Sequence, residues 1–273
     1  MTGRPYGDNL DPELSEALEG IPPLQGRYSA AARPADGSLA AQDGVTLLGR
    51  MTFDLSQVAL GIGLEHLACW YALPLQARRM PAVTHFTLIR TALEGATLAR
   101  WLLEPMTEGE RISRSARAQW DDYEQQRQMQ EVAGAPTEQR DGWKPASQKQ
   151  RELLAAVDSA GLKLAERRSK TYRFDHYVFP EEQVAKHGGR RLGKLLYQIL
   201  SAPAHAHQWS AYQSARWELL EESKVRPGTQ TMLLSGRQDV AQVMTVIAVL
   251  AFSDAITEFE RYGAQRSTGE GAS

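Results

Sequence analysis

The chain has 273 residues, of which 42% are hydrophobic and 23% are charged, and its formal net charge at pH 7 is −2. This composition is typical of a globular protein with a substantial core, and a charge so near zero provides no general attraction to nucleic acid or to an anionic membrane. Any basic surface that binds such a partner must therefore be local.

The single cysteine, Cys69, lies in an apolar run, so we expect it to be a small buried residue without a disulfide partner in the chain. The first residues lack the basic stretch and apolar core of a signal peptide. The apolar run at 240–252 is shorter than the roughly 20 residues that cross a bilayer. These features predict a cytoplasmic protein that does not enter a membrane.

Residues 1–43 contain five prolines among small residues, and only Asp11-Pro12 has the pattern of a helix start. We expect a mobile arm with one short helix there. Apolar residues then recur with the helical period at 45–73, which predicts a long buried helix that Pro74 ends. A second helix is expected at 82–103 and a third, more polar helix at 108–132.

The glycine and proline content of the next stretch predicts a loop and an internal boundary at 134–146, after which the helical pattern resumes. The aromatic run at 172–179 lacks a helical period and predicts a short strand or an extended loop. The remaining predicted helices are at 190–200, 203–223 and 238–262, before a disordered tail at 263–273. The chain is thus predicted to be an all-α bundle of roughly six or seven helices, with one domain at 44–262.

The second predicted helix carries Arg90 and Glu94 one turn apart, on the face that also holds Trp101. One interpretation is the solvated stripe of an amphipathic helix with a surface ion pair. The other is a central helix whose charged pair lines a cavity, where further polar groups must match it.

The later segment places Tyr197, Ser201 and His205 at intervals of four residues. Because Pro203 disfavours helical geometry before it, we expect a break, with Ser201 as the N-cap of a new helix. His205 would then lie in the first turn, where the helix dipole keeps the ring neutral and able to act as a base. The alternative is a histidine that only bonds two helices together.

A metal site is a further possibility, because Glu65, His66, Glu94, His205 and His207 could converge in a bundle core, as in carboxylate-bridged di-iron proteins. The Glu-x-x-His pattern of those sites does not follow Glu65 or Glu94. We therefore expect no metal and no other cofactor.

The segment 163–194 holds nine Lys and Arg residues against four acidic residues, with four aromatic residues among them. Cations that contact phosphates and rings that stack on bases are what single-stranded nucleic acid binding requires. The segment predicts an RNA-binding surface, and a solvated charged surface is the alternative.

Three segments together resemble a family of uncharacterised bacterial helical proteins. The shared features are an Arg-x-x-x-Glu helix, a Trp-Leu-Leu-x-Pro, a helix with paired arginines and a Tyr-x-x-Leu-Ser-x-x-x-His. They correspond here to Arg90 and Glu94, 101–105, Arg111 and Arg114, and 197–205. The resemblance covers about 82–210.

These proteins look distantly like the HEPN superfamily of helical bundles, many of which are metal-independent ribonucleases of toxin and defence systems that often act as dimers. The resemblance implies a homodimer that binds or cleaves RNA. His205 would act as acid or base, and Glu94 and Tyr197 would orient the groups around it. The residues expected to hold the substrate are Arg90, Arg111, Arg114, Ser201 and Trp101. The alternatives are a non-catalytic protein-interaction bundle and a small-molecule enzyme that uses a pocket at Arg90, Glu94 and His205.

Overall fold

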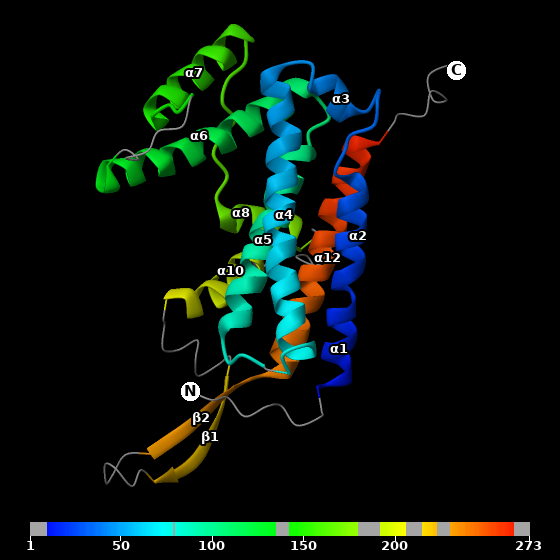
Figure 1. Cartoon of the computed structure of the whole chain (residues 1–273), viewed down its shortest axis with the longest axis vertical. Coiled ribbons are helices and arrows are strands. Elements are labelled where there is room, and N and C mark those ends of the chain that lie inside the picture. Colours follow the sequence, from blue (N-terminus) through cyan, green and yellow to red (C-terminus); the bar gives the residue numbers. More distant parts are fainter. Residues whose placement is uncertain are drawn as a thin grey trace. The chain divides into compact units, whose positions relative to one another are not determined.

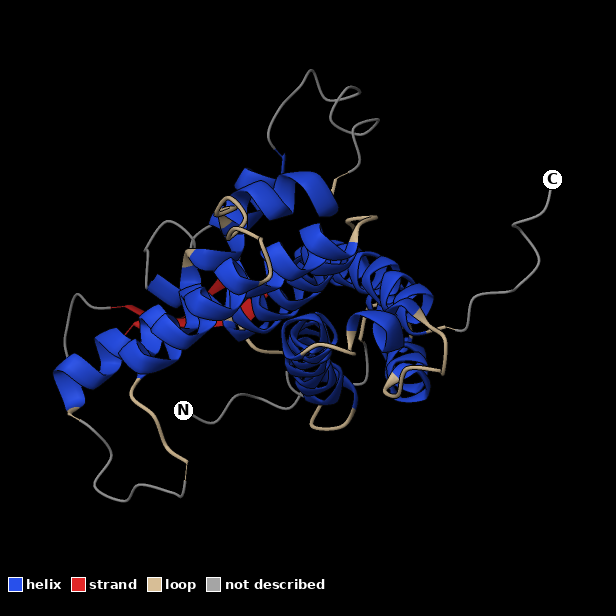
Figure 2. Cartoon of the chain, turned by 90° about the horizontal axis from the view of Figure 1, so that it is seen from above, coloured by secondary structure: helices blue, strands red, loops and turns tan. Residues whose placement is uncertain are grey.

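The computed structural model describes residues 10–78, 80–134, 142–179, 192–205, 215–222 and 230–264. They form a helical bundle, as predicted, together with one β-hairpin that the sequence did not lead us to expect (Figures 1 and 2). In chain order the elements are α1 (Pro12–Glu19), α2 (Ile21–Ala31), α3 (Leu39–Asp43), α4 (Leu47–Leu75), α5 (Thr84–Leu103), α6 (Glu108–Ala133), α7 (Ala146–Ser159), α8 (Lys170–Tyr177), α10 (Leu192–Ser201), the 3-10 helix η1 (Pro203–His205), β1 (Ala215–Glu222), β2 (Gln230–Gly236) and α12 (Gln238–Gly263).

The chain divides into two compact units that alternate along the sequence. The first contains Met1–Ala32, Ala59–Leu98 and Ser169–Thr257, and the second contains Arg33–Val58, Ala99–Arg168 and Glu258–Ser273. The long helices α4, α5 and α12 therefore contribute residues to both units. The internal boundary expected at 134–146 falls inside the second unit.

The prediction of a mobile arm with one short helix is wrong for residues 10–43, which form three helices. Asp11 caps α1 as expected, since its Oδ1 accepts from the Glu13 N–H at 3.0 Å. Leucines of α1 and Ile21 of α2 are fully buried, and Figure 1 shows both helices beside α12. The prolines of α2 occupy its first turn, where a missing N–H costs no helical hydrogen bond.

Helices α4 and α5 of the first unit approach each other at backbone distance. A Cβ added at Gly95 would lie 2.3 Å from the Ala59 carbonyl oxygen, so only glycine fits there. The predicted bounds of both helices are nearly correct, and Pro74 lies in the last turn of α4. Cys69 is exposed on α4, so its predicted burial is wrong.

Two local predictions fail for identifiable reasons. Most of the aromatic run belongs to a helix, α8, and not to a strand or an extended loop. The Ser169 hydroxyl caps this helix by accepting from the Tyr172 N–H at 3.1 Å, and Phe174 and Tyr177 form its buried face. The helix expected over 203–223 is instead η1 followed by β1, and residues 206–214 of that prediction lie outside the described chain. The alternation of polar and apolar residues from Arg216 has the period of a strand.

By length and composition alone, α4 and α12 are candidate membrane spans, with mean hydropathies of 1.4 and 1.8 over their most apolar windows. The run at 240–252 is thus part of a longer apolar helix. Core helices of globular proteins meet the same criterion, and each of these helices has buried residues within its unit.

Candidate functional site

A charged cluster joins α5, α8 and α10 in the first unit. Arg90 Nε donates to Glu94 Oε1 at 2.8 Å, and Arg90 Nη2 donates to the Tyr197 hydroxyl at 3.3 Å. Lys170 Nζ donates to the other carboxylate oxygen of Glu94 at 2.5 Å. The structure therefore brings together three of the predicted site residues and adds Lys170, which sequence reasoning placed only within a general basic segment.

The cluster lies at the edge of the core. It is neither a fully solvated surface pair nor a fully buried pair, the two alternatives that the sequence left open. The side chains of Arg90 and Glu94 are 17% and 20% exposed, whereas that of Lys170 is 48% exposed. Two cations share one carboxylate, so the cluster carries a formal charge of +1. The guanidinium also lies over the Tyr197 ring, 5.2 Å from its centre.

Helices α8 and α10, which both contribute to this cluster, pack closely against each other. The buried Phe174 ring meets the Tyr197 ring edge-on at 5.4 Å. A Cβ added at Gly193 would lie 2.2 Å from the Asp175 backbone nitrogen, and Asp175 Oδ1 accepts from the Lys194 N–H at 3.0 Å. The position of α8 is thus fixed by close backbone packing and by a cap on the first turn of α10.

Two rings lie on the side of α8 that is opposite to its buried Phe174. The rings of Tyr172 and His176, one turn apart, are stacked at 5.7 Å with an interplanar angle of 15°. Tyr172 remains 38% exposed. Lys170 and Arg173 lie on the same helix, three residues apart. Lys170 lies on the Glu94 side of the helix and Tyr172 and His176 lie on another side, and we call these three exposed residues together the α8 face.

Ser201 does not have the N-cap role that the sequence suggested, and His205 lies in the short helix η1. Ser201 is the last residue of α10, not the N-cap of a following helix. Its buried hydroxyl has no hydrogen-bond partner among the described residues. His205 ends the short helix η1, is exposed, and donates its backbone N–H to the Ala202 carbonyl at 3.2 Å.

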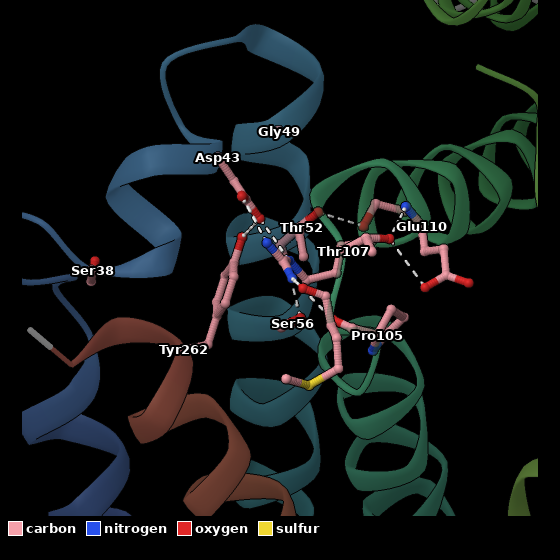
Figure 3. Close-up of polar contacts among 12 residues, drawn as sticks. Ser38, Asp43, Gly49, Thr52, Ser56, Pro105, Thr107, Glu110 and Tyr262 are labelled. Atoms are coloured by element: carbon pink, nitrogen blue, oxygen red, sulfur yellow. Dashed lines mark hydrogen bonds and ion pairs between the residues drawn. The ribbon is translucent and has the colours of Figure 1, made fainter. Parts of the chain in front are cut away.

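Arg111 belongs to the second unit and is held in a buried ion pair (Figure 3). Its Nε and Nη2 donate to the two Asp43 oxygens at 2.7 and 2.9 Å, and the Tyr262 hydroxyl donates to Asp43 Oδ2 at 2.7 Å. Arg111 Nη1 donates to the carbonyls of Pro105 and Met106 at 2.9 and 3.0 Å. Each guanidinium nitrogen of Arg111 thus has a protein acceptor.

The ionisation of this cluster follows from its burial and its pairing. Burial of Arg111 opposes the charged form, but the hydrogen bonds and charge of Asp43 outweigh it and raise the pKa of the guanidinium. Burial, and then the hydrogen bond to Asp43, raise the pKa of the Tyr262 hydroxyl. Tyr262 therefore stays a neutral donor, and Arg111 stays charged.

Arg114 and Trp101 form a third arrangement, also in the second unit. Arg114 Nη1 donates to the Trp101 carbonyl at 2.8 Å and to Glu104 Oε2 at 3.0 Å. The Arg114 guanidinium lies 5.7 Å from the centre of the Trp101 ring. These contacts tie α6 to the end of α5, which is a packing role.

Within the described ranges, no three His, Cys, Asp or Glu residues gather closely enough to hold a metal ion. His207, one of the residues considered for such a site, lies outside those ranges. The Arg90 cluster contains a single carboxylate and two cations, which is a composition suited to anions rather than to metal ions.

No protein-family model, curated protein or solved structure matched the chain. The likeness to HEPN bundles therefore stays a prediction, and the functional argument depends on the geometry of α5, α8 and α10.

Proposed function

We propose that the protein binds single-stranded RNA through the α8 face. The observation that carries the proposal is the stacked pair of Tyr172 and His176 on an exposed helix that also bears Lys170 and Arg173. Stacking on a base is worth about 1–3 kcal/mol per base and tolerates any sequence, while cations bind the phosphates between the bases. Because the net charge of the chain is near zero, such an attraction has to come from a local group of cations.

The cluster of Arg90, Glu94, Tyr197 and Lys170 fixes the position of α8 in this function. Glu94 holds Lys170 at the first turn of α8, and Tyr197 holds the guanidinium of Arg90 behind it. A phosphate that approaches Lys170 meets a local excess of positive charge, because Glu94 neutralises only one of the two cations. In this function Arg90, Glu94 and Tyr197 position the α8 face and do not react.

Binding is a better-supported function than cleavage. The HEPN ribonucleases that the sequence resembles use an Arg-x(4 to 6)-His motif, and the corresponding residues 198–200 before His205 are Gln, Ile and Leu. His205 is nevertheless exposed on η1, where a substrate in solution could reach its imidazole. Incubation of labelled RNA in EDTA with the wild type and with His205→Ala tests metal-independent cleavage directly.

The binding experiment compares two lysines in similar surroundings. Lys170 is 48% exposed and paired with Glu94, and Lys144 is 45% exposed and paired with Glu152 at 2.6 Å. We expect Lys170→Gln to weaken binding of a labelled single-stranded RNA and to reduce the slope of log Kd against log salt by about 0.7, the value for one lost phosphate contact. Lys144→Gln should leave both unchanged.

The aromatic part of the proposal has its own variant. Tyr172→Ala should weaken binding about 5- to 150-fold, which corresponds to the loss of about 1–3 kcal/mol of base stacking, with the salt slope unchanged. Equal affinities for wild type and Tyr172→Ala, or equal effects of Lys170→Gln and Lys144→Gln, would exclude the α8 face as the RNA site.

A further inference from the structure

Glu94 is the acceptor that the two cations of its cluster share. Arg90 Nε donates to one of its carboxylate oxygens at 2.8 Å, and Lys170 Nζ donates to the other at 2.5 Å. The remaining member of the cluster, Tyr197, offers Arg90 a hydroxyl and not a carboxylate. Within the described part of the chain, Glu94 is therefore the only carboxylate that pairs with either cation.

The Glu94 carboxylate contacts the two cations in the way that a phosphate group would. A phosphate that binds two cations presents one oxygen to each of them, and the two oxygens of Glu94 are divided between Arg90 and Lys170 in the same manner. Hydrogen bonds between ionised groups are also stronger than neutral ones. A phosphate that binds Lys170 must therefore share the ammonium with Glu94 or displace the carboxylate from it.

The position of α8 has other supports besides this ion pair. Close backbone packing at Gly193 and the bond from the Lys194 N–H to Asp175 hold α8 against α10, and Phe174 of α8 is fully buried. The Lys170 side chain is 48% exposed, and exposed ion pairs contribute little to stability. Loss of the Glu94 charge should therefore leave α8 in place and change mainly the charge that the cluster offers to a ligand.

We propose that Glu94 is a built-in competitor of RNA, whose carboxylate occupies Lys170 and Arg90 in the free protein and opposes each phosphate that binds there. The inference rests on the proposed RNA-binding function and deepens it, because it names the residue that limits the affinity of the α8 face. With Glu94 charged, the cluster carries a formal charge of +1, and Glu94→Gln raises that charge to +2.

Two effects of Glu94 on binding have opposite signs. The carboxylate orders the flexible Lys170 side chain, so its loss gives the ligand more side-chain entropy to overcome. It also repels a phosphate on the same ammonium, which would lie about 5 Å away, inside the screening length of about 8 Å at physiological salt. In water, repulsion at about 5 Å corresponds to a factor of about four in affinity, and to more at the edge of a protein core. The repulsion is larger because it acts at both cations, whereas the entropy concerns one side chain.

The test measures the affinity of a labelled single-stranded RNA for the full chain over a range of salt concentrations. We expect Glu94→Gln to bind at least about threefold more tightly than the wild type and to steepen the slope of log Kd against log salt by up to about 0.7. The matched control is Glu65→Gln, an exposed glutamate of α4 in the same unit, which makes the same change in net charge. It should leave the affinity and the slope nearly unchanged.

A double-mutant cycle separates competition at the cluster from a general effect of charge. In a Lys170→Gln background, Glu94→Gln should gain much less affinity than it gains in the wild type. A second pair of variants covers damage to the fold of α5: the double variant Arg90→Gln, Glu94→Gln removes both charges of the helical pair at once. It should bind RNA more tightly than Arg90→Gln alone, with both melting temperatures followed by circular dichroism.

The outcomes distinguish this inference from the function on which it rests. Wild-type binding that is lost in Tyr172→Ala, with equal affinities for Glu94→Gln and Glu65→Gln, would keep the α8 face as the RNA site and overturn the competition. Binding by Glu94→Gln but not by the wild type would support the competition in its strongest form. RNA binding by neither the wild type nor Glu94→Gln would overturn both proposals.

Discussion

Replacing Arg111 by methionine tests whether the buried ion pair with Asp43 is structural. Arg111→Met keeps an unbranched side chain of similar length but removes the donors to both Asp43 oxygens and to two backbone carbonyls. The carboxylate would then keep only the Tyr262 hydroxyl in a site where both charged side chains are 3% exposed.

The expected loss follows from that burial. Removing one member of a buried ion pair costs about 3–5 kcal/mol, because the remaining charge is left without its partner. For a chain of 273 residues, an unfolding entropy of about 2.1 cal/mol/K per residue converts this loss into a fall of about 5–9 °C in the melting temperature.

The assay is thermal unfolding followed by circular dichroism, beside RNA binding by the folded variant at 20 °C or below. Arg114→Met is the control, since Arg114 is 25% exposed on the same helix and should lose much less stability. The triple variant Asp43→Leu, Arg111→Met, Tyr262→Phe replaces the whole cluster by apolar groups and should recover most of the lost stability. An Arg111→Met protein with unchanged melting temperature and lost RNA binding would refute a structural role.

Two further predictions concern buried groups of the first unit. Burial lowers the pKa of His85 to about 4, below the unfolded value of about 6.5, so its contribution to stability is complete above pH 6.5 and is lost as the pH falls toward 4. His85→Gln should flatten the dependence of the unfolding free energy on pH by up to about 3 kcal/mol, which chemical denaturation at pH 7 and at pH 4 would measure. Gly95→Ala places a Cβ against the Ala59 carbonyl and should lower the melting temperature by several degrees, whereas Gly26→Ala, with open space around its Cβ, should be neutral or slightly stabilising. A neutral Gly95→Ala would show that α4 and α5 do not approach at backbone distance.

Helical periodicity predicted the long elements because their signal extends over many turns. The bounds of α5 and α6 were close to the observed ones, and α12 was placed correctly. The predictions of short elements failed where one local contact outweighs the pattern of apolar residues. Ser169 starts α8 by capping it, and the prolines of α2 sit where a helix accepts them. Such contacts leave only a single-residue signal in the sequence.

The candidate site was predictable only in part for a different reason. The pairing of Arg90 with Glu94 follows from their spacing on one helix. The third partner, Lys170, is 76 residues away from Glu94, and no local pattern connects the two. Arg111 resembled a phosphate ligand because its type and its position beside Arg114 are visible in the sequence, whereas Asp43 lies 68 residues before it.

The partners and the exposure of Arg111 and Lys170 differ, and the difference decides which of the two a ligand can reach. The nitrogens of Arg111 donate to protein acceptors, among them the buried carboxylate of Asp43. A ligand that bound Arg111 would have to break these hydrogen bonds and leave the Asp43 charge buried without its partner, which is unfavourable. Lys170 has one acceptor and a side chain that is nearly half exposed, so a phosphate can approach it without that cost. Of these cations, Lys170 is the one that RNA can approach, and the buried arginine can influence binding only through the stability of its unit.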